Sequence, residues 1–302
     1  MDSYEVTQSK IDFFHENGYV FFNDIIDRKT INELIDHIEG LLTGKYDSSE
    51  FHAGPASTQT DKDIGKYILQ VTPAGFNKGV KRIEDPALNK ISKHPVINSI
   101  AKQLLNIPEV GIFQQQALIK DPGFENNTPW HQDDFYWRSE QTAITCWTPL
   151  QECNIENGTM YLYPKSHKLG VLEHIKAKGD SLFHVVKKPL NESNFIPVDI
   201  ELGGVSFHHA QTIHGSFINN GNQRRIALAQ HYSKPKSWFG WNSIGAELNP
   251  LIPKKQFIKT QNISSSSVNR WMKNGSLHYV KKPNGRVFFR RKQIARFINN
   301  HW

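Results

Sequence analysis

Hydrophobic residues in the first third of the chain follow the spacing of amphipathic helices. A first helical pattern stops at Gly18 and gives way to a strand-like run over residues 19–22. Apolar residues at i, i+3, i+4 and i+7 predict an amphipathic helix over residues 27–44, and a similar pattern predicts another over residues 94–106. The polar residues 45–64 predict a mobile loop.

From about residue 109 the pattern changes to short apolar runs separated by Gly, Pro or Asn. Short strands after a helical start are typical of a β-sandwich or jelly roll with helices packed on one side. A chain of 302 residues has room for one large domain, or for a large domain and a small one. The runs are VGIFQQQALIK, TAITCWTPL, GTMYLYP, GGVSFHH and IALAQHYS.

The net charge of +7 is unevenly distributed. Residues 250–302 contain seven Lys, five Arg and no Asp or Glu, which gives +12 and leaves −5 for residues 1–249. Such asymmetry predicts two units with different functions, of which the basic one can face a polyanion. We therefore expect a larger domain over residues 1–245 and a small module over residues 250–302.

Cysteine content and hydropathy argue for a cytoplasmic protein. The two cysteines, Cys146 and Cys153, are too few for a disulfide framework. The N-terminal residues lack the basic start and the apolar run of a signal peptide. No stretch approaches the roughly 20 apolar residues that span a bilayer, so we expect no membrane contact.

The segment WHQDDFYW, residues 130–137, places a histidine and two carboxylates among aromatic rings. Such polar groups need partners if they are buried. In a strand or at its end, residues i and i+2 point to the same side, which pairs His131 with Asp133 rather than with Asp134. Residues 208–214 offer three further histidines, His208, His209 and His214. Two histidines and one carboxylate form the facial triad of non-haem Fe(II) oxygenases, which leaves three positions open.

An arginine that could bind a carboxylate follows these histidines in the sequence. Arg225 follows His214 by eleven residues, in a run whose alternation predicts a strand. An arginine fork suits the bidentate binding of a carboxylate. Arg224 competes with it, and spacing and strand parity favour Arg225. His167 is a further candidate ligand, although a loop position that caps or orients fits it better.

These motifs together resemble the phytanoyl-CoA dioxygenase family of Fe(II)- and 2-oxoglutarate-dependent oxygenases. The resemblance covers roughly residues 10–240. It includes FFHENGYVFFNDII, WHQD, NGTMYLYPKSHKLG, and HGS followed by an arginine. It implies a mainly-β domain with flanking helices, built on a double-stranded β-helix (jelly roll, cupin-like).

The resemblance also implies roles for individual residues. His131, Asp133 and His214 would bind iron, with Gly215 and Ser216 matching the family pattern after the histidine. Residues implied in binding 2-oxoglutarate are Arg225, Ser216, Trp147, Gln116 and Gln114, although the register of the glutamines is open by one residue. The implied cofactors are Fe(II) and 2-oxoglutarate, with O2 as co-substrate.

Asp133 also favours one reaction over another. Halogenating relatives replace this carboxylate by a small residue, so its presence favours hydroxylation of an unactivated carbon, with release of succinate and CO2. The substrate would be a small molecule that no motif identifies. Candidate substrate contacts are Asp134, Tyr136, Trp238 and Trp241.

The basic C-terminal module resembles an excisionase-type or MerR-type winged helix-turn-helix. We expect helices over residues 253–260 and 265–275, a hairpin at Asn284-Gly285 and a final helix, with Trp271, Phe288, Ile294 and Phe297 in its core. The implied DNA contacts are Asn269, Arg270, Lys281, Lys282 and Arg286. A basic cap on the active site, or self-association, would explain the module equally well.

An alternative function therefore stands beside the enzyme. The chain could be a DNA-binding regulator whose oxygenase-like domain senses 2-oxoglutarate, iron or oxygen, or an oxygenase directed to nucleic acid.

Overall fold

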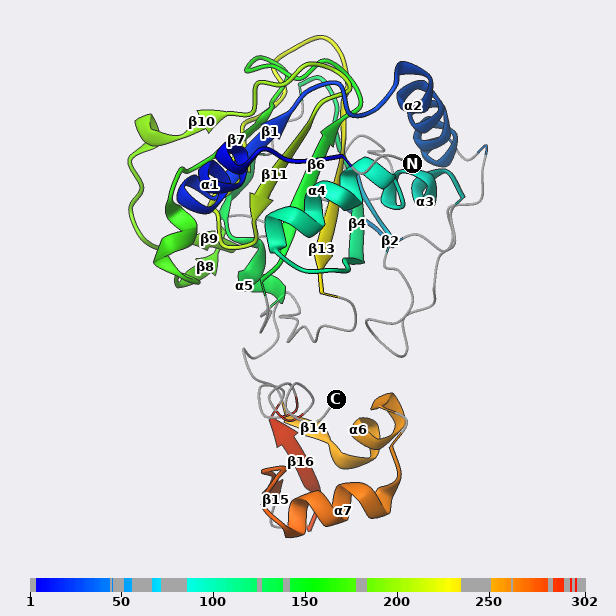
Figure 1. Ribbon diagram of the computed structural model, residues 1–302, viewed down its shortest axis with the longest axis vertical. Helices are drawn as coiled ribbons and strands as arrows, with labels where there is room; N and C mark the ends of the chain where they lie inside the picture. Colours follow the sequence, from blue (N-terminus) through cyan, green and yellow to red (C-terminus); the bar gives the residue numbers. More distant parts are fainter. Residues whose placement is uncertain are drawn as a thin grey trace.

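The structure is a computed structural model of the 302-residue chain (Figure 1). It describes residues 4–43, 45, 52–55, 67–71, 86–123, 127–137, 142–177, 184–234, 251–261, 263–281, 285–290, 294 and 297.

Seven antiparallel strands form the larger sheet, in the order β1-β11-β6-β13-β4-β3-β2. They are β1 (Tyr19–Phe22), β2 (His52–Pro55), β3 (Tyr67–Val71), β4 (Gly111–Lys120), β6 (Ile144–Pro149), β11 (Val205–His209) and β13 (Arg225–Ser233). β2 lies inside the stretch predicted as a mobile loop, so that prediction is wrong for residues 52–55. The edge strand β2 forms by backbone hydrogen bonding to β3. Such pairing does not depend on a pattern of apolar side chains, so the sequence did not predict it.

A second sheet of four strands has the order β10-β7-β12-β5. Its strands are β5 (Thr128–His131), β7 (Met160–Leu162), β10 (Ile196–Pro197) and β12 (His214–Ser216). The short helix α5 (Asp133–Trp137) follows β5, and a separate hairpin joins β8 (His174–Lys176) to β9 (His184–Val186). Two 3-10 turns, η2 (Ser166–Leu169) and η3 (Glu192–Asn194), lie in the connections.

In the described part of the chain, four helices precede β4: α1 (Gln8–Asn17), α2 (Arg28–Leu42), α3 (Pro86–Ser92) and α4 (Pro95–Leu105). The patterns over 27–44 and 94–106 predicted α2 and α4 to within two residues at each end. Gly18 closes α1 in the left-handed region at φ 82°, where an L side chain is strained, and its N–H donates to the carbonyl of Phe14. Figure 1 shows α1 and α4 lying across one face of the larger sheet.

The larger sheet separates two apolar clusters, and alternation along β13 shows how. Ile226 and Leu228 belong to the cluster that also contains buried residues of the four helices. Ala227 and Ala229 belong to a second cluster, with Trp147 and residues of β7. Side chains at odd-numbered positions of β13 therefore face the second sheet, which is where the candidate site lies.

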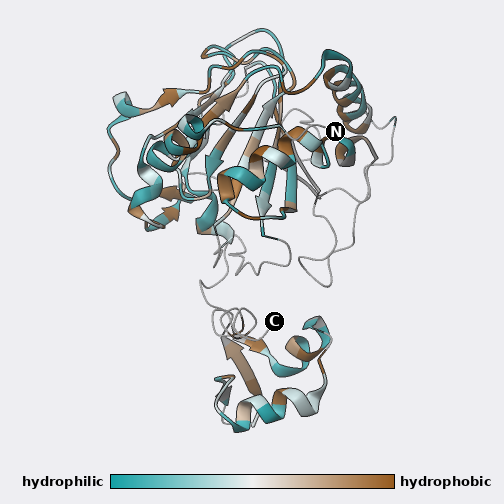
Figure 2. Cartoon of the chain, in the orientation of Figure 1, coloured by the Kyte–Doolittle hydropathy of each residue, from teal (hydrophilic) through white to brown (hydrophobic). Residues whose placement is uncertain are grey.

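The C-terminal residues form a separate set of elements with their own apolar cluster. The elements are β14 (Leu251–Pro253), α6 (Lys254–Gln261), α7 (Ser265–Lys273), β15 (Val280–Lys281) and β16 (Val287–Arg290), with the strands in the order β14-β16-β15. Ser264 caps α7 by accepting a hydrogen bond from the N–H of Ser267 at 3.0 Å. Figure 2 shows hydrophobic colour on β16 and mixed colours along α7, as expected for a buried strand and a helix with one exposed face.

One predicted core residue of this module is wrong. Phe289 is fully buried, whereas Phe288 is half-buried, because alternation along β16 turns Phe289 to the cluster. Ile294 and Phe297 are buried as predicted, and Trp271 packs against the cluster while half-buried. The predicted boundary at residues 245–250 and the remainder of the final helix lie outside the described residues.

Among the described residues, no helix combines the length and hydrophobicity that a membrane span requires.

Candidate metal centre

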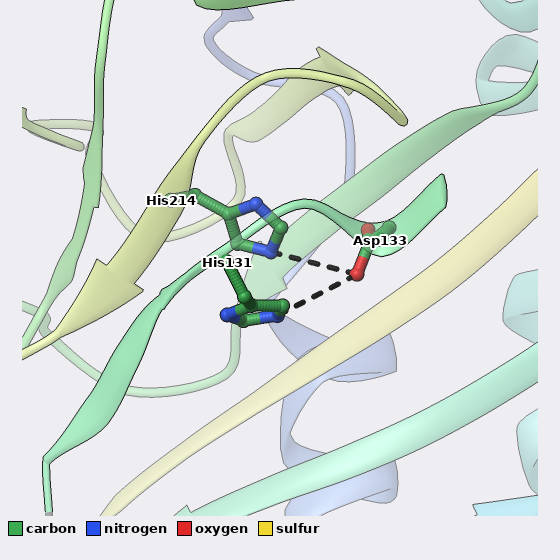
Figure 3. A group of neighbouring side chains, drawn as sticks. All are labelled: His131, Asp133 and His214. Carbon is green, nitrogen blue, oxygen red and sulfur yellow. Dashed lines mark ion pairs between the residues drawn. The ribbon is translucent and has the colours of Figure 1, made fainter. Parts of the chain in front are cut away.

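His131, Asp133 and His214 place three possible ligand atoms within 4.8 Å of one another (Figure 3). His131 is the last residue of β5, Asp133 the first of α5 and His214 the first of β12. The Asp133 Oδ1 atom lies 3.7 Å from Nε2 of His131 and 3.6 Å from Nε2 of His214. All three side chains are buried, so the group forms a preformed, convergent set of donors.

Sheet pairing and a turn bring the group together. β12 pairs with β5 so that His214 lies directly opposite His131, and opposite residues of an antiparallel pair share a face. The chain then leaves β5 and enters α5, so Asp133 reaches the same point from the start of a helix. The prediction of Asp133 rather than Asp134 assumed that the strand continues past His131. In the structure Asp133 is instead the first residue of α5.

The ring protons of the two histidines are fixed by backbone carbonyls. The Nδ1 atom of His131 lies 2.7 Å from the Pro129 oxygen, and that of His214 lies 2.9 Å from the Thr212 oxygen. Because a carbonyl oxygen only accepts, each Nδ1 carries a proton that it donates, so in the neutral form of the ring Nε2 presents a lone pair. Burial also lowers the pKa of His214 well below its ordinary value, which favours the neutral ring that a metal requires.

A cation fits this arrangement. When both rings are neutral, two imidazole lone pairs and a carboxylate oxygen face one another, which is unfavourable until a positive ion fills the centre. Two imidazoles and one carboxylate are the donor set typical of non-haem Fe(II) sites with open positions.

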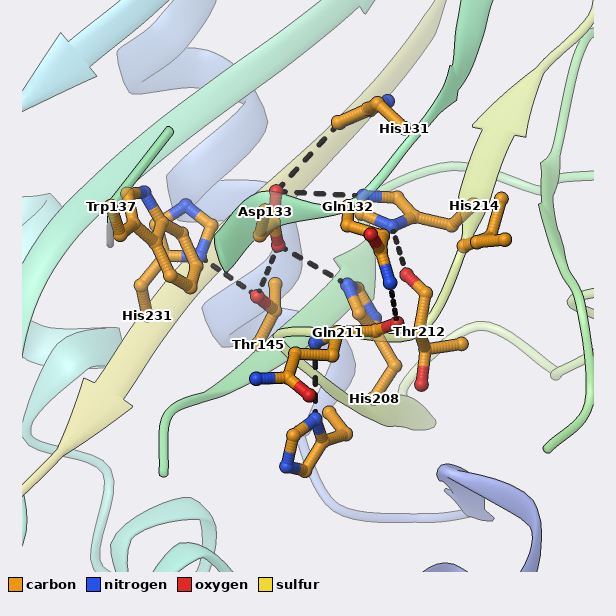
Figure 4. A network of polar contacts seen from close by, with 12 residues as sticks. His131, Gln132, Asp133, Trp137, Thr145, His208, Gln211, Thr212, His214 and His231 are labelled. Carbon is orange, nitrogen blue, oxygen red and sulfur yellow. Dashed lines mark hydrogen bonds and ion pairs between the residues drawn. The ribbon is translucent and has the colours of Figure 1, made fainter. Parts of the chain in front are cut away.

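The outer oxygen of Asp133 is held by a second pair of side chains (Figure 4). Thr145 donates its hydroxyl hydrogen to Asp133 Oδ2 at 2.8 Å, and His231 Nδ1 lies 2.9 Å from the same hydroxyl oxygen. Since a hydroxyl has one hydrogen, Nδ1 of His231 must donate to it. The hydrogen bond from Thr145 occupies Oδ2 and leaves Oδ1 facing His131 and His214. The carboxylate is thereby oriented to bind a metal through one oxygen.

The other candidate histidines lie outside the group of three. His208 is buried with Nε2 3.5 Å from Asp133 Oδ2, and neither ring nitrogen has a hydrogen-bond partner among the described residues. His209 points elsewhere, since its Nδ1 accepts from the N–H of Gln211. His167 Nε2 lies 3.0 Å from the carbonyl oxygen of His15, which agrees with the predicted orienting role.

The two adjacent arginines separate. Arg225 is 2% exposed and donates to the carbonyls of Gly158, at 2.9 Å, and Leu118, at 3.3 Å. Its Nε is buried without a partner among the described residues, which leaves donor capacity for an anion. Arg224 instead forms ion pairs with Glu39 and Asp121. Arg225 is therefore the arginine that lines the pocket.

Lys120 is a second buried basic residue, and it was not among the site residues predicted from the sequence. It lies opposite Arg225 on β4, is 5% exposed, and donates to the carbonyls of Ser216 and Phe217. Burial, with a further contribution from Arg225, lowers its pKa to about 6. A signal was available, because Lys120 shares the parity of Gln116 in a strand.

The group of three lies in a pocket of about 800 Å³, a volume that includes its open mouth. Of the predicted 2-oxoglutarate contacts, Gln116, Trp147, Ser216 and Arg225 line it. Gln114 does not, because its amide oxygen accepts from Nε1 of Trp137 at 3.1 Å. The remaining wall consists of Leu118, Ile119, Lys120, Asn127, Thr128, Thr145, Met160, His208, Gly215, Ala229 and His231, besides the three candidate ligands.

The predicted substrate contacts are not brought together here. Asp134 accepts from Nε2 of Gln211 at 2.9 Å, and the hydroxyl of Tyr136 accepts from the N–H of His184 at 2.8 Å. Neither residue lines the pocket. Trp238 and Trp241 lie outside the described residues.

The predicted DNA contacts of the C-terminal module are mostly exposed. Asn269 and Arg270 lie on α7, and Asn269 accepts a hydrogen bond from Lys254. These two residues, Lys281 and Arg286 are exposed, and Lys282 lies outside the described residues.

Comparison with known proteins places this site in context. The family model for "Phytanoyl-CoA dioxygenase (PhyH)" matches residues 14–227. The "Probable alpha-ketoglutarate-dependent hypophosphite dioxygenase" of Stutzerimonas stutzeri is 31% identical over 236 residues, covering 74% of this chain and 77% of that protein. The "Probable phytanoyl-CoA dioxygenase" of Caenorhabditis elegans is 23% identical over 239 residues, covering 73% of each.

Solved structures share the fold. The epimerase SnoN, in complex with Fe3+, alpha-ketoglutarate and nogalamycin RO, superposes with a TM-score of 0.58 at 20% identity, covering 79% of this chain and 87% of that chain. The fold is thus that of the non-haem, α-ketoglutarate-dependent oxygenases, a mainly-β, cupin-like class, as the sequence predicted. The chain belongs to the phytanoyl-CoA dioxygenase family. The prediction of iron and 2-oxoglutarate as cofactors is confirmed at the level of the family.

Proposed function

We propose that this chain is an Fe(II)- and 2-oxoglutarate-dependent dioxygenase that hydroxylates an unactivated carbon of a small molecule, releasing succinate and CO2. The observation that carries the proposal is the convergence of one possible ligand atom each from His131, Asp133 and His214 within 4.8 Å, with all three residues buried. These three side chains would hold Fe(II) and leave positions open for the keto acid and O2.

The co-substrate would lie along the inner face of the larger sheet. Arg225 would bind its distal carboxylate through the donor capacity that its backbone contacts leave, with Lys120 and Ser216 at the same end of the pocket. Gln116 and Trp147 would line the wall between that end and the metal ligands. Lys120 beside the arginine would become cationic when the carboxylate binds, which suits a dianionic co-substrate.

When bound, Fe(II) and 2-oxoglutarate would supply the electrons that activate O2, which is the oxidant for the unactivated C–H bond. The residues of the chain would orient the metal ligands and enclose the pocket. The carbonyls that receive the Nδ1–H groups fix both imidazole rings, and Thr145 fixes Asp133. Met160, Trp147 and Ala229 provide an apolar wall that limits water in the pocket.

The relatives do not identify one substrate. Their names refer to phytanoyl-CoA, hypophosphite and ectoine, which share little chemistry. We therefore propose a small molecule as the substrate and name no particular compound. We also propose a jelly-roll core within residues 1–245 and a cytoplasmic location.

Turnover of the keto acid tests the proposal. The metal-free protein is loaded anaerobically with Fe(II) and 2-oxoglutarate, exposed to air with a panel of candidate substrates, and succinate is measured by mass spectrometry. We expect succinate from the wild-type chain and none from Asp133→Ala. A wild-type protein that binds Fe(II) yet never consumes 2-oxoglutarate would contradict the enzyme and favour a sensor of 2-oxoglutarate, iron or oxygen.

A second function is favoured by the charge of residues 250–302, which form a separate module in our proposal. This segment carries +12 with no acidic residue, and α7 exposes Asn269 and Arg270 while Val268 is buried. A short, exposed, basic helix beside a hairpin suits the major groove of duplex DNA. The module would then direct the oxygenase to nucleic acid or make it a regulator.

Salt dependence tests the nucleic-acid contact. Binding of a labelled random duplex is followed by fluorescence anisotropy between about 25 and 200 mM salt, where phosphate contacts give a steep fall in affinity. Arg270→Ala with Lys281→Ala should weaken binding and flatten the slope. Lys187→Ala, which removes an exposed lysine paired with Glu173, serves as the control. No binding at the lowest salt removes this function and leaves a cap or self-association.

A further inference from the structure

Gln132, the residue between the first two candidate ligands, is fully buried and makes three side-chain hydrogen bonds. Its amide nitrogen donates to the carbonyl of Gly170 at 2.8 Å and to that of Gln211 at 2.6 Å. Its amide oxygen accepts from the N–H of Leu172 at 2.8 Å. The amide thus ties the ligand turn to two distant segments, one of which appears in Figure 4.

The backbone of Gln132 is held as well. Its N–H donates to Nε2 of His174 at 3.1 Å, and Nδ1 of His174 lies 3.0 Å from the carbonyl oxygen of Leu172. Since that carbonyl only accepts, Nδ1 carries the proton and Nε2 offers its lone pair to Gln132. The His174 ring also stacks on Phe135, with centroids 4.2 Å apart and 18° between the planes.

These hydrogen bonds hold the chain just beyond the end of β5, where sheet pairing no longer holds it. The strand β5 stops at His131 and α5 starts at Asp133, so residue 132 lies in neither element. The four bonds of Gln132 connect it instead to residues 170–174 and to residue 211, which precedes His214 by three positions. One residue therefore links the segments that carry all three candidate ligands.

We propose that Gln132 and His174 are positioning residues, which hold the turn so that His131 and Asp133 converge before the metal arrives. The inference rests on the proposed function, because it takes these two residues as ligands. Loss of the bonds leaves the turn to be ordered by the metal itself, which weakens metal binding. Outer-shell partners of this kind typically change metal affinity by about 10- to 100-fold.

Two amide substitutions at position 174 form a matched pair. The shorter side chain of His174→Asn can donate to the Leu172 carbonyl but does not reach the N–H of Gln132. The longer side chain of His174→Gln can place its oxygen where Nε2 now lies. We expect His174→Asn to weaken Co(II) binding by about 10-fold or more, and to speed hydrogen exchange of the Gln132 amide in the metal-free protein. His174→Gln should recover both to within about threefold of wild type.

The control is Thr159→Val, which removes one buried hydrogen bond, from Thr159 to the Val198 carbonyl at 2.9 Å, away from the turn. It should lower the melting temperature as a buried bond does, with Co(II) affinity within about twofold of wild type. Should His174→Asn fail to fold, Gln132→Glu provides the comparison, since it keeps the acceptor for Leu172 and loses both donor bonds.

The outcomes separate the two proposals. Equal Co(II) affinity of wild type and the turn variants, or equal weakening by Thr159→Val, overturns the positioning role. Failure of a folded His174→Gln to recover affinity overturns it too. A wild-type chain that binds neither Co(II) nor Fe(II) refutes the metal centre itself, and with it the proposed function.

Discussion

Arg224 and Arg225 are consecutive residues that serve opposite sides of the larger sheet. Arg224 bonds to both carboxylate oxygens of Glu39, at 2.9 and 2.7 Å, whereas Arg225 lies in the pocket beside Lys120. Substitution of each should therefore affect a different property of the protein.

Arg225→Ala should raise the KM for 2-oxoglutarate by about 30-fold or more, because loss of a charge-assisted partner for a buried carboxylate costs at least about 2 kcal/mol. Arg224→Ala should leave that KM within about twofold and lower stability by roughly 1 kcal/mol, since its ion pairs are partly exposed. Steady-state kinetics and chemical denaturation measure the two effects. An equal rise in KM in both variants would contradict the assignment.

Asp133 and Asp134 provide a second adjacent comparison. Asp133→Ala should weaken Fe(II) binding by more than about 100-fold, beyond the range of outer-shell changes. Asp134→Asn should keep it within about threefold, because Asp134 faces Gln211 rather than the two histidines. Competition with a chromophoric chelator measures both affinities. If the Asn variant loses iron as completely as the Ala variant, the ligand choice is wrong.

Thr145 should matter more to the metal than its size suggests. Thr145→Val removes the donor to Asp133 Oδ2 and leaves the buried Nδ1–H of His231 without its acceptor. We expect metal affinity to fall about 10-fold and stability to fall by about 1–3 kcal/mol. Thr148→Val is the matched control, because Thr148 is equally buried on the same strand with the opposite parity. Unchanged metal affinity in Thr145→Val would remove the orienting role.

Binding of 2-oxoglutarate should depend on pH through Lys120. In the ligand-free chain the pKa of Lys120 is lowered to about 6, so the amine is largely neutral at pH 7.5 or so. A bound carboxylate favours the ammonium form and raises that pKa, so binding takes up a proton. Affinity should therefore be greatest near pH 6 and fall as pH rises, until the pKa of the complex is reached.

The check is KM for 2-oxoglutarate against pH in wild type and Lys120→Met. The substitution should raise KM at pH 6 and remove the part of the slope that wild type shows above pH 6. Identical slopes in the two proteins would show that another group titrates.

Periodic patterns predicted the regular elements well. The helices α2 and α4 carry apolar residues at helical spacing, and the run predicted as a strand after Arg225 lies in β13. β2 could not be predicted, because its formation depends on pairing with β3 rather than on its own side chains. Phe288 and Phe289 show that the sequence did not determine which face of β16 enters the core. Two adjacent phenylalanines fit either parity, and only the packed module decides between them.

The site shows the same division. Spacing paired His131 with Asp133, and the family resemblance selected His214 among three histidines; these three residues converge. The helix α5 is too short to reveal a helical period, so the turn at Gln132 was not predicted. Lys120 was overlooked because lysine is seldom fully buried. His231 and His174 come from distant segments, and only the folded chain shows that His231 contacts Thr145 and that His174 contacts the ligand turn.

His131 and His214 lie opposite each other on β5 and β12. As the proposed iron ligands, they would make metal binding depend on strand register. A slip of one residue in that pairing would turn one imidazole to the other face of the sheet and dismantle the group. Metal affinity is therefore a sensitive gauge of correct pairing in the smaller sheet. A misfolded or slipped population of this chain would show up as a fraction of protein that never takes up its ion.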